Sequence, residues 1–348
     1  MQLVQLDSNW LEMACGPMPD HGISGDFHSA ATVGCMAVGR MNLCLGSWGG
    51  DKMGGERVIH SVRIDLADDQ RKLSRSRVAS LLDHKVLDNR VYEPVGHCIY
   101  CGARDNLEKE HVLPFGLSGS AILPKSSCRT CAAITGAVEE DMLRGAFWPV
   151  RIYRDLKSRT KHKNAPRKFL VSVVRGGQPE EVLIEIGDLP IILPFPLFPL
   201  PGHLSQTHTQ AGILVSGVAS VHFGTQLKTT GKALAASKVS VTAEIKPAQF
   251  ARMIAKIGYA YACAEGAISD LDGNPFVLPA ILGRRDEIGR WVGTLTKPIE
   301  RFPGVLHRIA VHHDWENRLL FAEVQLFSDS ETPSYGVVLG KLDLAKRR

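Results

Sequence analysis

Residues 98–131 read CIYCGARDNLEKEHVLPFGLSGSAILPKSSCRTC and concentrate the ligand-bearing side chains of the chain. Two Cys-x-x-Cys pairs frame a segment of 26 residues, and four thiolates in two tight pairs form the soft tetrahedral ligand set that zinc prefers. Closing such a loop costs about 3 kcal/mol, whereas structural zinc binding contributes on the order of 10 kcal/mol or more. The spacing therefore predicts a structural Zn²⁺, with buried free thiols or a redox pair as alternatives, at Cys98, Cys101, Cys128 and Cys131.

Inside this frame an acidic residue stands directly before a histidine. Glu110 and His111 are followed by two apolar residues and Pro114. A histidine on its own is more often structural, but this one lies between the two halves of a predicted metal-stapled unit. Gly102 follows the first cysteine pair, where a left-handed backbone is often needed. The Glu-His pair is therefore a candidate site.

The order Cys-x-x-Cys, Glu-His-apolar-x-Pro and Cys-x-x-Cys opening a helix resembles the HNH endonuclease family with its ββα-metal finger. The likeness is greatest to the zinc-stapled bacterial branch and covers residues 96–148, which we call the finger. It implies that His111 is the general base that activates water against a phosphodiester, and that Glu110 binds a catalytic Mg²⁺ or Mn²⁺. The zinc would be structural, because four thiolates leave it no open position.

The finger also departs from the family pattern. Ala132 stands where the family commonly has a further metal ligand, and residues 119–125 offer only Ser120 and Lys125 in place of the family's middle asparagine. Glu139 shares the helix face of Ala132 but lies about 10 Å further along the axis. We expect Glu139 and the two acids that follow it to form a solvated face, with binding or support of a metal ion as the alternative. Either Glu110 holds the ion with water and substrate, or the chain binds without cutting.

A strongly basic segment follows the finger. Residues 151–168 carry eight Lys and Arg against the single acid Asp155, a net charge of +7 in a chain whose total is +5. Each cation that neutralises a phosphate adds salt-sensitive affinity for nucleic acid, whereas a solvated charged linker is the alternative. The residues expected to contact nucleic acid are Arg151, Arg154, Lys157, Arg159, Lys161 and Lys163.

The remainder of the chain is rich in β-branched and aromatic residues. One helix is expected at 247–267, where apolar residues recur at helical spacing. The result is an α+β fold in which the small finger precedes a mostly antiparallel sheet domain with a packed helix. The strands are expected at 169–174, 181–186, 212–222, 239–245, 308–313, 319–327 and 335–339.

Composition limits the classes of protein that this chain can belong to. With 44% hydrophobic and 22% charged residues it is neither wholly disordered nor collagenous. The most apolar stretch, 189–202, contains five prolines and is too short for a membrane span. Eight cysteines are too sparse for a disulfide scaffold, and half of them form the two pairs. Together with the lack of a signal-peptide pattern, this favours a reducing, cytoplasmic location.

Five segments follow from these patterns. Residues 1–55 show no lasting periodicity and are expected to be a disordered or misassigned leader, with Met53 as a candidate start. A strand at 58–64 and a basic helix at 65–85 are expected next. The predicted divisions are the leader at 1–55, the strand and helix at 56–95, the finger at 96–148, a basic linker at 149–168 and an α+β domain of unassigned role at 169–345.

Three functions remain open on the sequence. The leading hypothesis is a metal-dependent HNH endonuclease, acting on DNA by default. The second is a catalytically inactive zinc-finger protein that binds nucleic acid, which Ala132 favours and the intact pair of Glu110 and His111 disfavours. The third is a structural zinc domain for protein interaction, against which the +7 segment counts.

Overall fold

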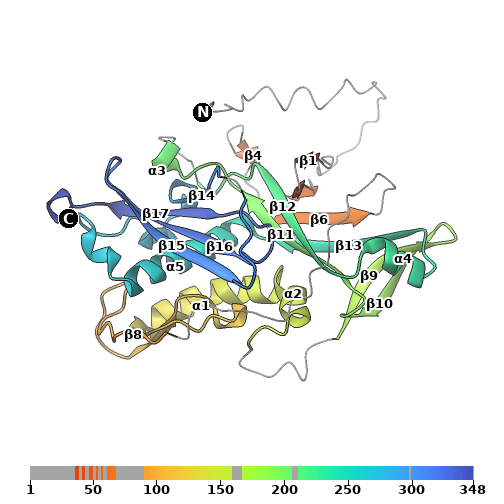
Figure 1. Ribbon diagram of the computed structural model, residues 1–348, viewed down its shortest axis with the longest axis horizontal. Coiled ribbons are helices and arrows are strands. Elements are labelled where there is room, and N and C mark those ends of the chain that lie inside the picture. The colour runs from red at the N-terminus through yellow and green to blue at the C-terminus, as the bar shows by residue number, and fades with distance from the viewer. Residues whose placement is uncertain are drawn as a thin grey trace. The chain divides into compact units, whose positions relative to one another are not determined.

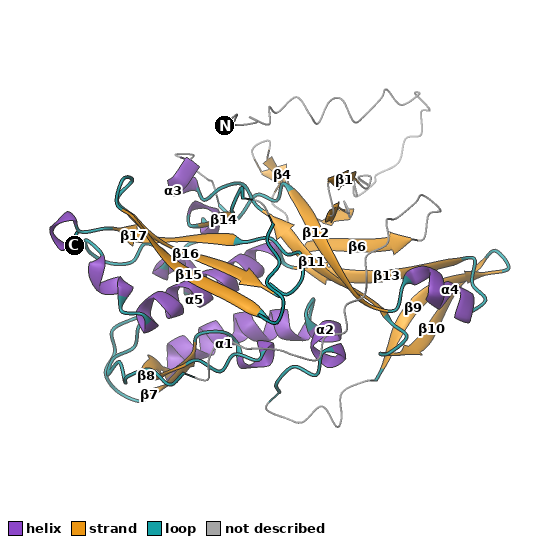
Figure 2. Cartoon of the chain, in the orientation of Figure 1, coloured by secondary structure: helices purple, strands orange, loops and turns teal. Residues whose placement is uncertain are grey.

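The computed structural model describes the backbone of short strands between residues 36 and 67, and it describes residues 90–158, 167–205, 211–297 and 299–347 in full. The chain divides into residues 1–30 and residues 31–348, and every described residue belongs to the second part. Helices accompany several antiparallel sheets (Figures 1 and 2), so the α+β prediction is confirmed.

The finger is a strand–strand–helix unit. Strand β7 (Leu107–His111) pairs antiparallel with β8 (Ile122–Cys128), and helix α1 (Arg129–Arg144) follows β8 without a loop. Residues 90–96 run beside β8, since Tyr92 N–H donates to the Ile122 carbonyl at 2.9 Å. This is the ββα order that the family resemblance implied. A short helix, α2 (Trp148–Tyr153), comes next and occupies the start of the segment expected to be a linker.

Helix α5 (Pro247–Ala264) is the central element of the fold. It contacts α1 of the finger and also a four-stranded antiparallel sheet, as Figure 1 shows. Twelve of its 18 residues are buried, because it has neighbours on both sides. The strands of this sheet, in spatial order, are β14 (Val292–Thr294), β17 (Tyr335–Lys341), β16 (Leu319–Leu326) and β15 (His307–Asp314).

Two further large sheets, one two-stranded sheet and three short α-helices are also described. One sheet has the order β10 (Gln178–Glu185), β9 (Lys168–Arg175), β13 (Lys238–Ile245), β6 (Ser61–Ala67) and β3 (Ser47–Gly49). The other has the order β1 (Met36–Val38), β2 (Met41–Leu43), β12 (Gly217–Gly224) and β11 (Pro190–Leu197). The remaining elements are the pair β4 (Lys52–Met53) and β5 (Glu56–Arg57), and the helices α3 (Gly202–Ser205), α4 (Leu227–Ala233) and α6 (Leu278–Ile281).

Strand β11 was not among the expected strands, and prolines usually interrupt strands. It lies at the edge of its sheet, and Pro190, Pro194 and Pro196 are an even number of residues apart. Alternate residues of an antiparallel strand turn their N–H groups to the same side, so all three missing donors can face away from β12. The structure also differs from the prediction for residues 1–55, because β1 to β4 form within this segment. The predicted helix at 65–85 begins within β6, and residues 68–85 lie outside the described part of the chain.

All seven strands that we expected beyond residue 168 have counterparts, in β9, β10, β12, β13, β15, β16 and β17. The expected helix at 247–267 is α5, which ends three residues earlier. Among the described residues, no helix combines the length and the apolar character needed to cross a bilayer.

Gly258 allows α5 to lie close to the sheet. A Cβ at this position would be 3.0 Å from Ala322 Cβ and 3.1 Å from Val337 Cγ2. Gly258→Ala should therefore lower the free energy of unfolding in urea by about 1–3 kcal/mol through overpacking, despite the roughly 1 kcal/mol by which alanine favours a helix. The control is Gly136→Ala on α1, where a Cβ meets no atom within 4 Å and stability should not fall. Equal stability of the two variants would contradict the close approach.

Candidate metal centre

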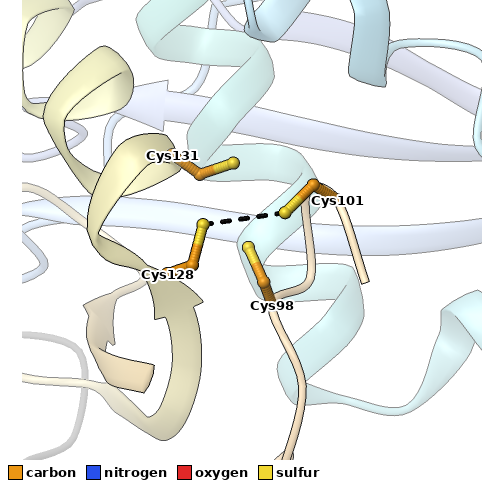
Figure 3. A group of neighbouring side chains, drawn as sticks. All are labelled: Cys98, Cys101, Cys128 and Cys131. Atoms are coloured by element: carbon orange, nitrogen blue, oxygen red, sulfur yellow. Dashed lines mark hydrogen bonds between the residues drawn. The ribbon is translucent and has the colours of Figure 1, made fainter. Parts of the chain in front are cut away.

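The four cysteines of the finger converge from two turns. Cys98 and Cys101 lie on a turn closed by the Gly102 N–H, which donates to the Cys98 carbonyl at 2.8 Å, and Gly102 has the expected positive φ of 78°. Cys128 ends β8 and Cys131 lies in the first turn of α1. All four sulfur atoms lie within 4.8 Å of one another, and those of Cys101 and Cys128 are 3.6 Å apart (Figure 3).

This geometry suits a tetrathiolate metal site. Zinc–sulfur bonds of about 2.3 Å place the sulfurs of a tetrahedron about 3.8 Å apart. The predicted ligands are thus brought together, and the group could hold a structural metal such as zinc. Among the described residues it is the only set of three or more His, Cys, Asp or Glu side chains that could hold a metal ion.

The protein environment treats the thiols differently. The Cys131 backbone N–H, at the start of α1, stabilises the Cys128 thiolate and lowers the pKa of that thiol to about 7. Burial raises the pKa of the Cys131 thiol, because a thiolate there would lose its solvation. A metal must therefore displace protons from the more basic thiols when it binds. The affinity of the site for zinc consequently falls as the pH falls.

Glu110 does not face solvent but takes part in a buried ion cluster. Its carboxylate Oε1 lies 2.6 Å from Lys256 Nζ, and Glu139 Oε1 lies 2.7 Å from the same nitrogen. Lys256 also donates to the His111 carbonyl, and its side chain is 2% exposed. An ammonium group from α5 thus lies between one carboxylate from β7 and another from α1. We call Glu110, Lys256 and Glu139 the Lys256 cluster.

The two carboxylates decide the charge of Lys256. Burial by itself lowers the pKa of the ammonium, but Glu110 and Glu139 more than reverse this effect, so the pKa lies above its ordinary value of 10.5. Lys256 is therefore protonated at neutral pH. A divalent ion at Glu110 would have to compete with a cation that is covalently part of the chain and is already in contact with the carboxylate.

The other residues expected around a catalytic metal add few ligands to Glu110. His111 ends β7 and is half-buried, with its ring 5.6 Å from that of Phe115. Ala132 is half-buried on α1 and offers no ligand atom. Glu139, expected on a solvated face, is instead directed to Lys256, whereas the next two acids do pair at the surface, Glu140 with Arg144 and Asp141 with Lys246.

Two of the six residues expected to contact nucleic acid are used inside the protein, and this corrects the sequence interpretation. Arg151 is 5% exposed and donates to the Gly116 and Leu143 carbonyls at 2.7 and 2.8 Å. Arg154 is buried in an ion pair with Asp329. They lie in and just after α2, which turns these side chains into the core. Lys157 is exposed, and Arg159, Lys161 and Lys163 lie outside the described residues.

Sequence reasoning missed Lys256 and the role of Glu139. A signal existed for the lysine, which is the only charged residue between Met253 and Ala264 in an otherwise apolar helix. Lysine is almost never fully buried unless it is paired, so such a position indicates a partner. The sequence does not reveal which carboxylate is the partner, because Glu110 and Glu139 are more than 100 residues away in the chain.

Zinc content tests the metal centre. The purified protein should contain one zinc per chain by elemental analysis, and Co²⁺ substitution should give the absorption of a tetrahedral thiolate site. Cys98→Ser and Cys131→Ser should lose the metal and unfold at a lower urea concentration. The matched control is Cys263→Ser, which removes a thiol outside the four-cysteine group and should retain the metal. Zinc lost equally from all three variants would contradict this assignment.

Removal of the buried ammonium tests the Lys256 cluster. Lys256→Met keeps most of the length of the side chain but leaves two carboxylates unpaired, so the free energy of unfolding at pH 7 should fall by about 3–5 kcal/mol. Because the folded pKa of Lys256 is raised, its contribution is complete below the unfolded value of 10.5 and is lost as the pH rises further. The difference between wild type and variant should therefore shrink above that pH. A constant difference up to pH 12 would show that Lys256 acts only by packing.

Comparison of the chain with models of protein families, with curated proteins and with solved structures found no match. The resemblance to HNH endonucleases therefore rests on the cysteine frame and the Glu-His motif of the finger. What the chain does has to be inferred from the geometry of its metal centre, the Lys256 cluster and the distribution of its charges.

Proposed function

We propose that this chain is a zinc-stabilised, HNH-like finger protein that binds nucleic acid without cutting it. The observation that carries the proposal is the contact of Lys256 Nζ with Glu110 at 2.6 Å inside a buried cluster. In the family that the finger resembles, the corresponding carboxylate holds a divalent ion. Here a lysine from outside the finger provides the cation.

The loss of catalysis follows from what a phosphodiesterase needs. Cleavage requires a cation that touches the scissile phosphate and a base that activates water. Lys256 is too deeply buried to reach a phosphate, since its side chain is 2% exposed. Ala132 adds no ligand, and Glu139 is engaged with the same lysine. His111 is left beside a neutralised carboxylate.

Binding of nucleic acid is supported by the basic segment that remains after Arg151 and Arg154 are set aside. Residues 157–168 contain six Lys and Arg and no Asp or Glu, a charge of +6 within twelve residues. Contacts between such a segment and phosphates release counterions, so they give affinity that falls steeply with salt. The zinc would stabilise the finger, and the basic segment follows the finger in the chain. A tetrathiolate site also suits a reducing compartment such as the cytoplasm.

A second candidate is the metal-dependent HNH endonuclease. One observation favours it: Glu110 and His111 are adjacent at the end of β7 in a ββα unit, and the His111 side chain is not fully buried. In this alternative, Mg²⁺ or Mn²⁺ would displace Lys256 from Glu110 when nucleic acid binds. The buried ammonium would then keep Glu139 but lose its ion pair with Glu110, which makes this the less favoured candidate.

A combined cleavage and binding experiment separates the candidates. The zinc-loaded protein is incubated with supercoiled plasmid, linear duplex, single-stranded DNA and RNA in Mg²⁺ or Mn²⁺, and binding to the same nucleic acids is measured by fluorescence anisotropy at several salt concentrations. We expect no cleavage above that of His111→Ala, together with salt-sensitive binding. Replacing Lys157, Arg159, Lys161 and Lys163 by Gln should reduce the duplex salt slope by up to about 0.9 per lost phosphate contact.

The control replaces three exposed lysines elsewhere, Lys228, Lys232 and Lys238, by Gln, and should leave the salt slope unchanged. Metal-dependent cleavage that disappears in His111→Ala would establish the second candidate. Absence of binding to every nucleic acid would refute both candidates and leave a structural zinc domain that serves protein interaction.

A further inference from the structure

A second group of charges lies on β15, on β16 and in the loop after β14, outside the residues of the finger. The Glu323 carboxylate, 5% exposed, is 2.5 Å from Lys297 Nζ, 2.8 Å from Arg308 Nη1 and 3.3 Å from His312 Nε2. We call these four residues the Glu323 cluster. Because one carboxylate contacts all three basic groups, they must lie within a few ångströms of one another. A small patch of the sheet therefore gathers several donors.

The charges of this cluster do not cancel. Lys297 and Arg308 each carry a formal positive charge and Glu323 carries one negative charge, so an excess of +1 remains before His312 is counted. The adjoining loop adds Glu300 and Arg301, one charge of each sign. The side chains of Lys297 and Arg308 are each 34% exposed, and that of His312 is 39% exposed. The excess charge thus reaches the surface.

Aromatic rings accompany these cations. His312 and Phe321 face each other across β15 and β16, and their rings stack with centroids 4.8 Å apart and planes inclined by 20°. The Arg308 guanidinium lies 4.8 Å from the ring centroid of Phe302. Proteins recognise single-stranded nucleic acid with cations that contact its phosphates and with flat rings on which its bases stack. This sheet presents both kinds of group close together.

We propose that the Glu323 cluster binds a nucleotide unit of single-stranded nucleic acid. A phosphate is held by Lys297 and Arg308, which have N–H groups beyond those directed to Glu323. The base stacks at the His312–Phe321 pair. This inference rests on the proposed nucleic-acid binding and gives it a second surface, one that accepts a strand with unpaired bases. A duplex cannot use it, because its bases are already stacked on each other.

The test measures anisotropy of a fluorescein-labelled dT12 oligonucleotide at several salt concentrations. Lys297→Gln with Arg308→Gln should weaken binding roughly tenfold and reduce the salt slope by about 0.7 for each lost phosphate contact. His312→Ala should weaken binding by roughly tenfold without changing the slope, because it removes stacking surface and no permanent charge. Glu323→Gln should tighten binding, since it removes the only negative charge of the cluster. Thermal melting checks that each variant folds.

Arg175→Gln is the matched control. Arg175 has a side chain 35% exposed and pairs with Glu180 at 3.0 Å, but it lies on β9 in another sheet, so binding should not change. One outcome is that the cluster variants bind dT12 as tightly as Arg175→Gln does, while neutralisation of Lys157, Arg159, Lys161 and Lys163 abolishes binding. That result would refute the Glu323 cluster as a binding site and leave the proposed function standing. If wild type binds no nucleic acid, the proposed function fails. In that case the proteins are titrated with dTMP. The cluster site is refuted unless wild type binds dTMP and the double variant Lys297→Gln with Arg308→Gln does not.

Discussion

The buried ammonium of Lys256 is the contact on which the arrangement of this protein depends. It comes from α5, and among the described residues its ion-pair partners are carboxylates from β7 and α1 of the finger. An unpaired ammonium or an unpaired carboxylate in this position would cost several kcal/mol, so the loss of either partner destabilises the fold. The finger is for this reason an integral part of the fold rather than a module on a tether.

Other contacts reinforce the same junction with directional hydrogen bonds. The Tyr259 hydroxyl, one turn along α5 from Lys256, donates to the Ile99 carbonyl within the first cysteine turn at 2.5 Å. His307 on β15 accepts the Phe327 N–H at Nδ1, so its Nε2–H donates to the Leu117 carbonyl of the finger at 2.9 Å. The first bond connects the first cysteine turn to α5, and the second connects the segment between β7 and β8 to the sheet. A metal held by the cysteines would therefore also stabilise the packing of the finger against α5.

A cation that is part of the chain differs from a metal ion in what it permits. A bound metal exchanges, keeps open positions and can share a phosphate oxygen with its carboxylate ligand, whereas an ammonium enclosed by two carboxylates and a carbonyl does none of these. The Lys256 cluster thus gives the finger stability at the place where the family resemblance implies chemistry. In the Lys256 cluster two carboxylates surround one cation, whereas in the Glu323 cluster one carboxylate contacts several basic groups and positive charge is left over.

The sequence by itself determined the elements with strong local signals. The Cys-x-x-Cys spacing predicted a four-sulfur group that the structure brings together, and alternating β-branched residues and the apolar period of α5 predicted most strands and the main helix. These features follow from short-range geometry, which neighbouring residues encode. Strand β11 was not predicted, and its tolerance of three prolines depends on an edge position, because strand order in a sheet is not a local property.

Only the tertiary structure decided which charges are available for function. Arg151 and Arg154 belong to a run that looks uniformly basic in sequence, yet α2 directs both into the core, where Asp329 and backbone carbonyls receive them. Glu110 looks like a metal ligand until α5 brings Lys256 against it from a position 146 residues later in the chain. The physical reason is the same in both cases: the state of a charge depends on its burial and its partners, and long-range packing sets both.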